Sequence, residues 1–298
     1  MSFTHYLRCF WGITSREGLR FVNQRERFLS ALVRPLVWLL IFAAGFRSVL
    51  GISIIEPYET YILYEVYIAP GLIGMIQLFN GMQSSLSMVY DREMGSMRTL
   101  LVSPLPRWFL LVSKLFAGVA VSIVQVYTFL AIAWFWEVDP PALGYLSLFP
   151  ALILSGLMLG ALGMFLSSAI KQLENFAGVM NFVIFPMFFA SSALYPLWKM
   201  KESSEWLYEV CWLNPFTHAI ELIRFALYNQ MNWESFAYTL IATIIFLALA
   251  VYGYDPSRGI ITRKKVSTGL IGGYKTHENY ILSKIRTNLF FFIFSSFC

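Results

Sequence analysis

The segment with the densest set of chemically useful side chains is YDREMGSMRTLLVSPLPRW, residues 90–108. Its charges have both signs and are carried by Asp91, Arg92, Glu93 and Arg98. The spacing of Met94, Met97 and Leu101 predicts a short helix with one apolar face, which Pro104 and Pro106 would end. A helix too short to cross a bilayer, with charges and an apolar face, suits docking onto a soluble partner. The alternative is a solvated loop.

Uncharged polar side chains interrupt two apolar stretches. They are Gln77, Asn80 and Gln83, at steps of three, and Asn181, which lies close to Phe182 and Phe185. Amide groups on a wall rich in Met and Phe would suit an amphiphilic or apolar solute. The alternative is hydrogen bonding between helices, worth about 0.6–2 kcal/mol per bond.

A third polar region, LNPFTHAIELIRFALY, covers residues 213–228 and is predicted to be helical. Asn214 is placed to cap this helix, with Pro215 at its first position. Its apolar side, at three- and four-residue steps, consists of Phe216, Ile220, Ile223 and Leu227. Such a helix outside the lipid core is either re-entrant or a lid over an exit, and the alternative is an extracellular packing helix.

Familiar catalytic and cofactor motifs are missing from the sequence. GGYKT, residues 272–276, lacks the Gly-Lys pair of a phosphate-binding loop, and neither HExxH nor GxSxG occurs. Three histidines and three distant cysteines form no haem, zinc or disulfide pattern. No apolar stretch holds the paired carboxylates of a proton relay. We therefore expect no catalytic residue, no metal and no cofactor on this chain.

The elements that must position these residues are strongly apolar. Hydrophobic residues make up 58% of the 298 residues and charged residues 13%, whereas a soluble domain has about 45–50% apolar residues. A bilayer core of about 30 Å needs roughly 20 apolar residues in a helix. Six stretches qualify, and they are residues 35–55, 64–89, 109–136, 146–170, 176–197 and 236–254. In the fourth, Gly156, Gly160 and Gly163 form a face for close helix packing.

Basic residues set the expected orientation. With both termini in the cytoplasm, only Arg47, Lys199, Lys201 and Arg224 of the 22 Lys and Arg residues fall on the outer side. The positive-inside rule therefore predicts a multi-pass protein with both termini cytoplasmic. Residues 15–34 carry an interrupted apolar stripe among arginines, which predicts an amphipathic helix on the inner surface, or alternatively a basic flank. We assign residues 1–256 to a transmembrane domain and 257–298 to a cytoplasmic tail of unknown role.

Residues 67–115 closely resemble the permeases of type-2 ABC exporters, the group that includes nodulation, polysaccharide and drug exporter permeases. The shared pattern is a Pro-Gly pair in the second span, a charged Arg-Glu loop, an L-x-x-P turn and then the third span. LNPFTHAIELIRFALY matches their C-terminal region. The resemblance covers about residues 10–258 and extends to the permeases found beside quinoprotein alcohol-oxidation genes in Gram-negative bacteria.

This resemblance implies a homodimer of six-span subunits in the bacterial inner membrane, with separate ABC ATPase subunits that bind ATP and Mg²⁺. Residues 14–31 would form a connecting helix, and residues 90–101 the main coupling helix. The expected ATPase contacts are Tyr90, Asp91, Arg92, Glu93, Met94, Met97 and Arg98, with a smaller contact at Lys171 and Glu174.

The resemblance also assigns the path and its outer end. The translocation path would be lined by the second and fifth spans, at Gln77, Asn80, Gln83, Asn181, Phe182 and Phe185. The outer re-entrant segment would include Asn214, Pro215, Phe216, His218, Glu221 and Arg224.

We therefore expect an all-α polytopic membrane protein with six spans, an N-terminal surface helix and an outer re-entrant segment. Its expected role is that of a non-enzymatic permease subunit, which exports a small or amphiphilic solute and contacts an ABC ATPase, a second copy and lipid, but no nucleic acid. The alternatives are a secondary carrier working without ATP and an intramembrane enzyme or redox anchor. The missing carboxylates and the missing catalytic set count against these two.

Overall fold

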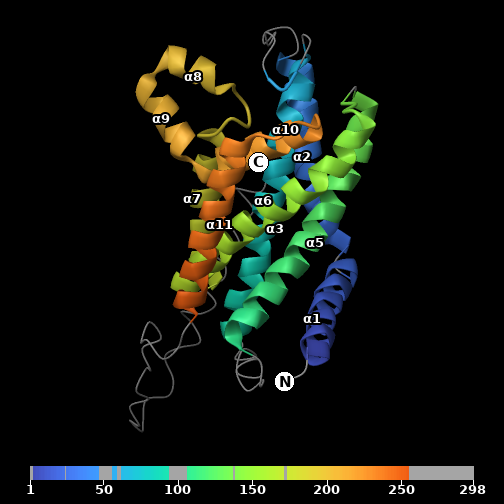
Figure 1. Cartoon of the computed structure of the whole chain (residues 1–298), viewed down its shortest axis with the longest axis vertical. Helices are drawn as coiled ribbons and strands as arrows, with labels where there is room; N and C mark the ends of the chain where they lie inside the picture. The colour runs from blue at the N-terminus through green and yellow to red at the C-terminus, as the bar shows by residue number, and fades with distance from the viewer. Residues whose placement is uncertain are drawn as a thin grey trace, which may run out of the picture. The chain divides into compact units, whose positions relative to one another are not determined.

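The computed structural model describes residues 3–23, 25–46, 56–58, 62–93, 106–136, 138–170 and 173–254. Its elements are α1 (Phe3–Asn23), α2 (Arg25–Phe46), α3 (Tyr64–Glu93), α5 (Arg107–Ala133), the 3₁₀ turn η1 (Trp134–Trp136), α6 (Ala142–Ala169), α7 (Leu173–Phe189), α8 (Leu197–Ser203), α9 (Glu205–Leu213), α10 (Pro215–Leu227) and α11 (Trp233–Gly253) (Figure 1). In these residues every element is helical, so the expected all-α class is confirmed. The predicted tail, residues 257–298, lies outside them.

Three helical stretches in the described part of the chain are long and apolar enough to cross a membrane. They are Trp108–Trp136, Ala142–Ala169 and Trp233–Gly253, and they correspond to the third, fourth and sixth predicted spans. α2 and α7 contain shorter apolar stretches, Ala31–Phe42 and Gly178–Phe189. The first, second and fifth spans, and hence the count of six, stay predictions.

α3 forms the core of the helical assembly. Its side chains Ile68, Leu72, Ile73 and Leu78 are fully buried, because α2, α5, α6, α7 and α10 all pack against it. α3 has 30 residues, which at 1.5 Å per residue is about 45 Å of continuous helix. Pro70 lies inside this helix without ending it.

α3 and α6 approach each other along a seam of glycines. A Cβ added to Gly81 would lie 3.0 Å from the Gly160 nitrogen, and one added to Gly163 would lie 2.9 Å from the Gly81 oxygen. On the other side of the seam, a Cβ on Gly156 would lie 3.2 Å from a methyl group of Val119 in α5. The predicted packing face is confirmed, because only glycine lets two helix backbones come this close.

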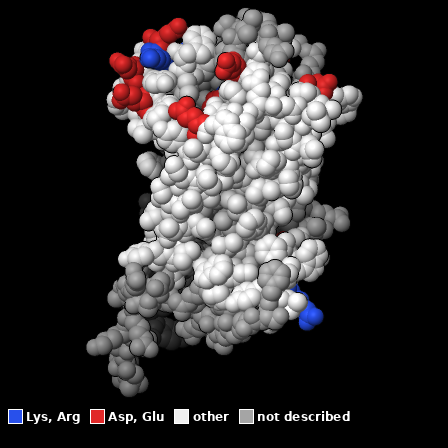
Figure 2. Space-filling model, in the orientation of Figure 1, with Lys and Arg blue, Asp and Glu red and all other residues white. Residues whose placement is uncertain are grey.

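The outward faces of the bundle are apolar. On α11, Ile241, Ile244 and Ile245 are each at least half exposed. Figure 2 shows a wide band of uncharged surface on the face it displays, with acidic side chains gathered at the end that carries α8 and α9. Exposed isoleucines in an uncharged band are what a surface in contact with lipid requires.

The fifth span was predicted to cover residues 176–197, and its predicted C-terminal end is wrong. α7 stops at Phe189 and residues 190–195 form a turn with no helix. This turn reads ASSALY, which hydropathy alone does not separate from the helix before it. At this end of α7, the side chain of Asn214 binds the carbonyls of Met187 and Ala190.

The N-terminal prediction also needs correction. In place of one surface helix over residues 15–34, α1 begins at Phe3, and α2 begins at Arg25 and runs through Pro35. α1 packs on α5 through two edge-to-face ring pairs, Tyr6 with Phe109 at 5.1 Å and Phe10 with Phe116 at 6.2 Å between centroids. These aromatic contacts link residues about a hundred positions apart, so the helical period of residues 3–23 by itself did not indicate them.

Replacing Gly163 with alanine should lower the free energy of unfolding by about 1–3 kcal/mol, because the new methyl group would overlap the Gly81 carbonyl. Gly178→Ala is the matched control, since a Cβ there meets nothing within 4 Å. Thermal unfolding in detergent should show Gly163→Ala melting below the wild type and Gly178→Ala at or above it. Equal melting temperatures for the wild type and Gly163→Ala would contradict the close approach.

Candidate functional site

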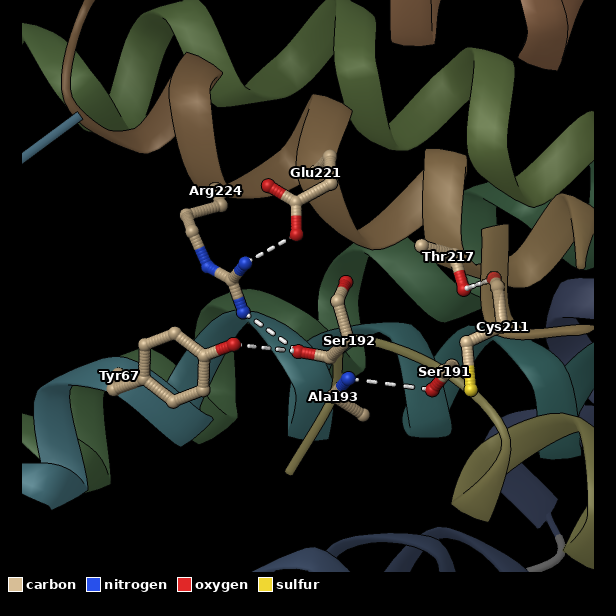
Figure 3. Close-up of polar contacts among 8 residues, drawn as sticks. All are labelled: Tyr67, Ser191, Ser192, Ala193, Cys211, Thr217, Glu221 and Arg224. Carbon is tan, nitrogen blue, oxygen red and sulfur yellow. Dashed lines mark hydrogen bonds and ion pairs between the residues drawn. The ribbon is translucent and has the colours of Figure 1, made fainter. Parts of the chain in front are cut away.

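A set of polar side chains from α3, from α10 and from the residue that caps α10 holds the turn that follows α7, and Figure 3 draws part of this set. We call it the outer clamp, after the side it would face in the expected orientation, and its members are Tyr64, Tyr67, Asn214, Glu221 and Arg224. The turn it holds consists of residues 190–195. Three elements that are distant in sequence are therefore fixed together at one end of the bundle.

Arg224 is the centre of the outer clamp. Only 3% of this residue is exposed, and its guanidinium group forms an ion pair with Glu221 one turn earlier on α10. Its Nη2 donates to the Ser192 carbonyl at 2.9 Å. The guanidinium carbon also lies 4.3 Å from the ring centroid of Tyr67, a cation–π distance. The buried guanidinium group is stabilised because the carboxylate of Glu221, the carbonyl of Ser192 and the ring of Tyr67 all face it.

The backbone carbonyls of the turn accept hydrogen bonds from side chains of α3. The Tyr67 hydroxyl donates to the same Ser192 carbonyl at 3.0 Å, and the Tyr64 hydroxyl donates to the Leu194 carbonyl at 2.9 Å. A carbonyl oxygen has two lone pairs, so Ser192 accepts from Arg224 and Tyr67 together. Because a buried non-helical backbone must find such partners, these tyrosines determine where the turn can lie.

Asn214 joins the end of α7 to the start of α10. Its Oδ1 accepts from the Phe216 nitrogen at 3.0 Å, and Pro215 occupies the first turn, so the predicted cap is confirmed. Its Nδ2 donates to the carbonyls of Met187 at 2.8 Å and Ala190 at 2.6 Å. One amide thus starts one helix and satisfies the last carbonyls of another. The cap could be read from sequence, but the second role could not.

The apolar side of α10 is buried as predicted. Phe216, Ile220, Ile223 and Leu227 are each at most 1% exposed. α10 has 13 residues and packs on α3, α6 and α11. It is too short to span a bilayer, and whether it is re-entrant stays a prediction.

His218 lies on α10 beside the first turns of α11. Its Nε2 donates to the Trp212 carbonyl at 2.9 Å, and its ring stacks on Tyr238 at 4.3 Å between centroids. Burial lowers the pKa of His218, against the opposing effects of the Trp212 carbonyl and the charges of Glu234 and Glu221. The imidazole acts here as a packing and hydrogen-bonding group.

The amides of α3 make hydrogen bonds to neighbouring helices. Gln77 donates to the Leu152 carbonyl at 2.8 Å and accepts from the Ser155 hydroxyl at 2.6 Å, both on α6. Asn80 donates to Gln125 of α5 at 2.8 Å. For Gln77 and Asn80 the interhelical alternative is thus observed. A role for them in a translocation path stays a prediction.

The other predicted path residues lie elsewhere. Gln83 lines a small cavity between α2 and α3, where the guanidinium of Arg34 stacks over Phe79 at 3.9 Å. On α7, Asn181, Phe182 and Phe185 are exposed, Phe182 by 79%. Within one copy of the chain, the structure therefore does not bring the α7 residues together with the amides of α3.

The predicted ATPase contact begins inside α3. Tyr90, Asp91, Arg92 and Glu93 are the last residues of α3, which corrects the expectation of a separate helix starting at residue 90. Tyr90 is 45% exposed. Glu174 lies in the first turn of α7. Met94, Met97, Arg98 and Lys171 lie outside the described residues, so the coupling contact as a whole stays a prediction.

Sequence reasoning missed two members of the outer clamp, Tyr64 and Tyr67, and the Ser192 carbonyl that the clamp binds. Two tyrosines three residues apart at the start of an apolar span were the available clue, since a buried hydroxyl needs a partner. Nothing in the sequence identified that partner. In the part of the chain that the structure describes, no group of three or more His, Cys, Asp or Glu side chains is placed to hold a metal.

Apolar membrane-length helices, an uncharged outer band and polar groups bonded inside the bundle define a multi-pass helical membrane protein. The chain belongs to the ABC-2 type transporter family, whose model matches residues 8–228, from α1 through α10. It is a type-2 ABC permease, and the expected resemblance is confirmed.

Individual relatives agree with this family. The protein ycf38 of Cyanophora paradoxa, named as a transport permease, is 30% identical over 219 residues, which is 72% of each chain. The ycf38 protein of Porphyra purpurea is 27% identical over 225 residues, or 74% of each chain. YbhR of Escherichia coli (strain K12), named as a multidrug ABC transporter permease, is 32% identical over 170 residues, or 56% of this chain and 45% of YbhR.

Removing donors from the outer clamp should destabilise the protein in a graded way. Tyr67→Phe should cost about 0.5–1.5 kcal/mol, because the Ser192 carbonyl keeps its bond from Arg224. Arg224→Met should cost about 3–5 kcal/mol, because it removes the ion pair with Glu221 as well. Tyr208→Phe, at a half-buried tyrosine of α9 outside the clamp and the turn, is the control and should be neutral. Thermal unfolding in detergent measures this order, and an Arg224→Met protein as stable as the wild type would contradict it.

Proposed function

We propose that the chain is the membrane-spanning permease subunit of an ATP-driven exporter in the bacterial inner membrane. Two copies would form the transmembrane unit, with both termini of each in the cytoplasm, and a separate ABC ATPase would bind ATP and Mg²⁺. Membership of the ABC-2 transporter family and the relatives named as permeases support this. The absence of a phosphate-binding motif from the sequence agrees with an ATPase on another chain.

The observation that carries the proposal is the course of α3. At its first turns it bears Tyr64 and Tyr67 of the outer clamp, and at its last turn it bears Asp91, Arg92 and Glu93 of the proposed ATPase contact. One continuous helix of about 45 Å therefore connects the two ends of the bundle. A displacement of its inner end cannot be absorbed by a loop before it reaches the outer end.

The proposed mechanism follows from this connection. Closure of the ATPase on ATP would move the coupling segment, residues 90–101, and α3 would carry the shift to the turn at residues 190–195. The carbonyls of Ser192 and Leu194 hydrogen bond directly to α3, so this turn would respond first. Transport would be driven only if the ATPase binds the two conformations with different affinity.

The solute class is proposed from the path residues. In the dimer, the exposed α7 side chains Asn181, Phe182 and Phe185 would face the α3 side of the path. Aromatic rings with a single amide suit a small or amphiphilic solute better than an ion.

The decisive experiment compares two kinds of proteoliposome. Vesicles with this chain and its ATPase should move a dye-like amphiphile uphill when ATP is supplied. Vesicles with this chain alone should not, with or without an imposed proton gradient. Uphill movement by the chain alone would favour the secondary carrier instead.

Glu93→Ala and Arg98→Ala should uncouple transport from the ATPase. Loss of one partner of a docked charge pair costs about 2–5 kcal/mol, so we expect transport to fall about tenfold or more while the protein stays in the membrane. Glu205→Ala, at an exposed acid on α9, is the control. The measurements are ATP hydrolysis and transport in the same vesicles. Wild-type transport by both single variants and by the double variant would exclude the docking role.

Cysteine labelling tests the proposed orientation. A membrane-impermeant maleimide applied from outside should react with Ser203→Cys, at the end of α8, and leave Ser96→Cys unmodified until the membrane is permeabilised. The positive-inside rule gives the physical reason, since the segments around residue 96 are basic. The reverse labelling pattern would overturn the orientation.

A further inference from the structure

α9 has three distinct sides. Cys211 faces inward and is fully buried. On the exposed side, Glu205 and Glu209 lie one turn apart and form an acidic flank. Next to them lie Trp206, Val210 and Leu213, exposed by 72%, 36% and 72%. We call these three residues the apolar flank of α9.

The C-terminal end of α9 lies close to α11. Trp212 contacts Tyr238 of α11 at 5.3 Å between ring centroids and also contacts His218 of α10 at 5.7 Å. Tyr238 lies five residues into α11, so the C-terminal end of α9 is held beside the second turn of a membrane-length helix. Further along α11, Ile241, Ile244 and Ile245 are exposed, as residues that contact lipid would be.

Aromatic residues mark the level at which α11 begins. Trp233, its first residue, is 72% exposed, and exposed Trp and Tyr concentrate where a bilayer meets water. Leu213 follows Trp212 directly and is therefore near the depth of Tyr238. The C-terminal end of the apolar flank therefore lies near the level that the aromatic residues of α11 mark.

We propose that α9 is an interfacial anchor, with Trp206, Val210 and Leu213 inserted among the lipids of the membrane surface and Glu205 and Glu209 facing water. A helix with one apolar and one charged flank lies in the interface plane in this way. The partner is thus the glycerol and upper acyl region of phospholipid. The assignment to the outer leaflet rests on the proposed orientation of the permease, whereas the lipid contact does not.

A second copy of the chain fits this flank less well. Glu205 and Glu209 border it along the same helix, so an interface between two copies would bring four carboxylates together. Like charges at a dry interface cost affinity. Lipid imposes no such requirement, because the acids stay on the water side.

Spin labels on α9 test the proposal in the full-length protein, in vesicles of phosphatidylethanolamine and phosphatidylglycerol. In a background with Cys9→Ser, Cys211→Ala and Cys298→Ser, single cysteines replace Trp206, Val210, Leu213, Glu205 and Glu209. Ile244→Cys on α11 is the lipid reference and Glu202→Cys on α8 is the water reference. The readout is the relaxation of each label by oxygen, which prefers lipid, and by a nickel chelate, which prefers water.

The labels at residues 206, 210 and 213 should resemble Ile244→Cys, with oxygen access several-fold above chelate access. The labels at residues 205 and 209 should resemble Glu202→Cys. All five labels behaving like Glu202→Cys would overturn the proposal. Labels at residues 206, 210 and 213 that neither reagent reaches, or that broaden one another between copies, would overturn it in favour of a protein contact.

A vesicle-side arm separates this proposal from the proposed function. Chelate added only outside should reach the labels at residues 205 and 209. The opposite result, in right-side-out vesicles, is that the chelate reaches the labels at residues 205 and 209 only when it is inside the lumen. If the labels at residues 206, 210 and 213 still contact lipid in that case, the proposed orientation is wrong and the anchor proposal stands. Loss of lipid contact in a protein that still transports with its ATPase would remove the anchor alone.

Discussion

The end of this permease that carries the outer clamp depends on the hydrogen bonding of backbone carbonyls that no helix satisfies. Between α7 and α8 the chain leaves the helical state in apolar surroundings, where an unpaired carbonyl is costly. Arg224 and Tyr67 supply donors to Ser192, Tyr64 supplies one to Leu194, and Asn214 supplies one to Ala190. Because these donors sit on α3 and α10, satisfying the turn also fixes the relative positions of three helices.

The glycine seam complements this arrangement along the length of the bundle. The backbones of Gly81 and Gly163 lie so close that α6 supports α3 without intervening side chains. Gln77 then bonds to Leu152 and Ser155 across the same pair of helices. Close packing resists bending, so α3 is held as a rod between the outer clamp and the end where the ATPase is proposed to dock.

Hydropathy placed the independent helices well. The predicted spans 109–136, 146–170 and 236–254 differ from α5 with η1, α6 and α11 by at most four residues at any end. Each consists of apolar residues bounded by polar ones, and the length of such a run is a local property of the sequence. The prediction failed for α1 and for the end of α7. The ring of Tyr6 in α1 packs on Phe109, and the carbonyl at the end of α7 accepts a hydrogen bond from Asn214. Both partners are distant in sequence, so local hydropathy did not reveal them.

The sequence by itself determined that this chain is a helical membrane protein, that Asn214 caps a helix and that glycines line one face of α6. These follow from composition, short-range spacing and the size of side chains. Only the tertiary structure decided which groups meet: Arg224 with Ser192, Gln77 with Ser155, and Trp212 with Tyr238. The physical reason is that a buried polar or aromatic side chain specifies the kind of partner it needs, whereas the packing of distant helices selects which partner it finds.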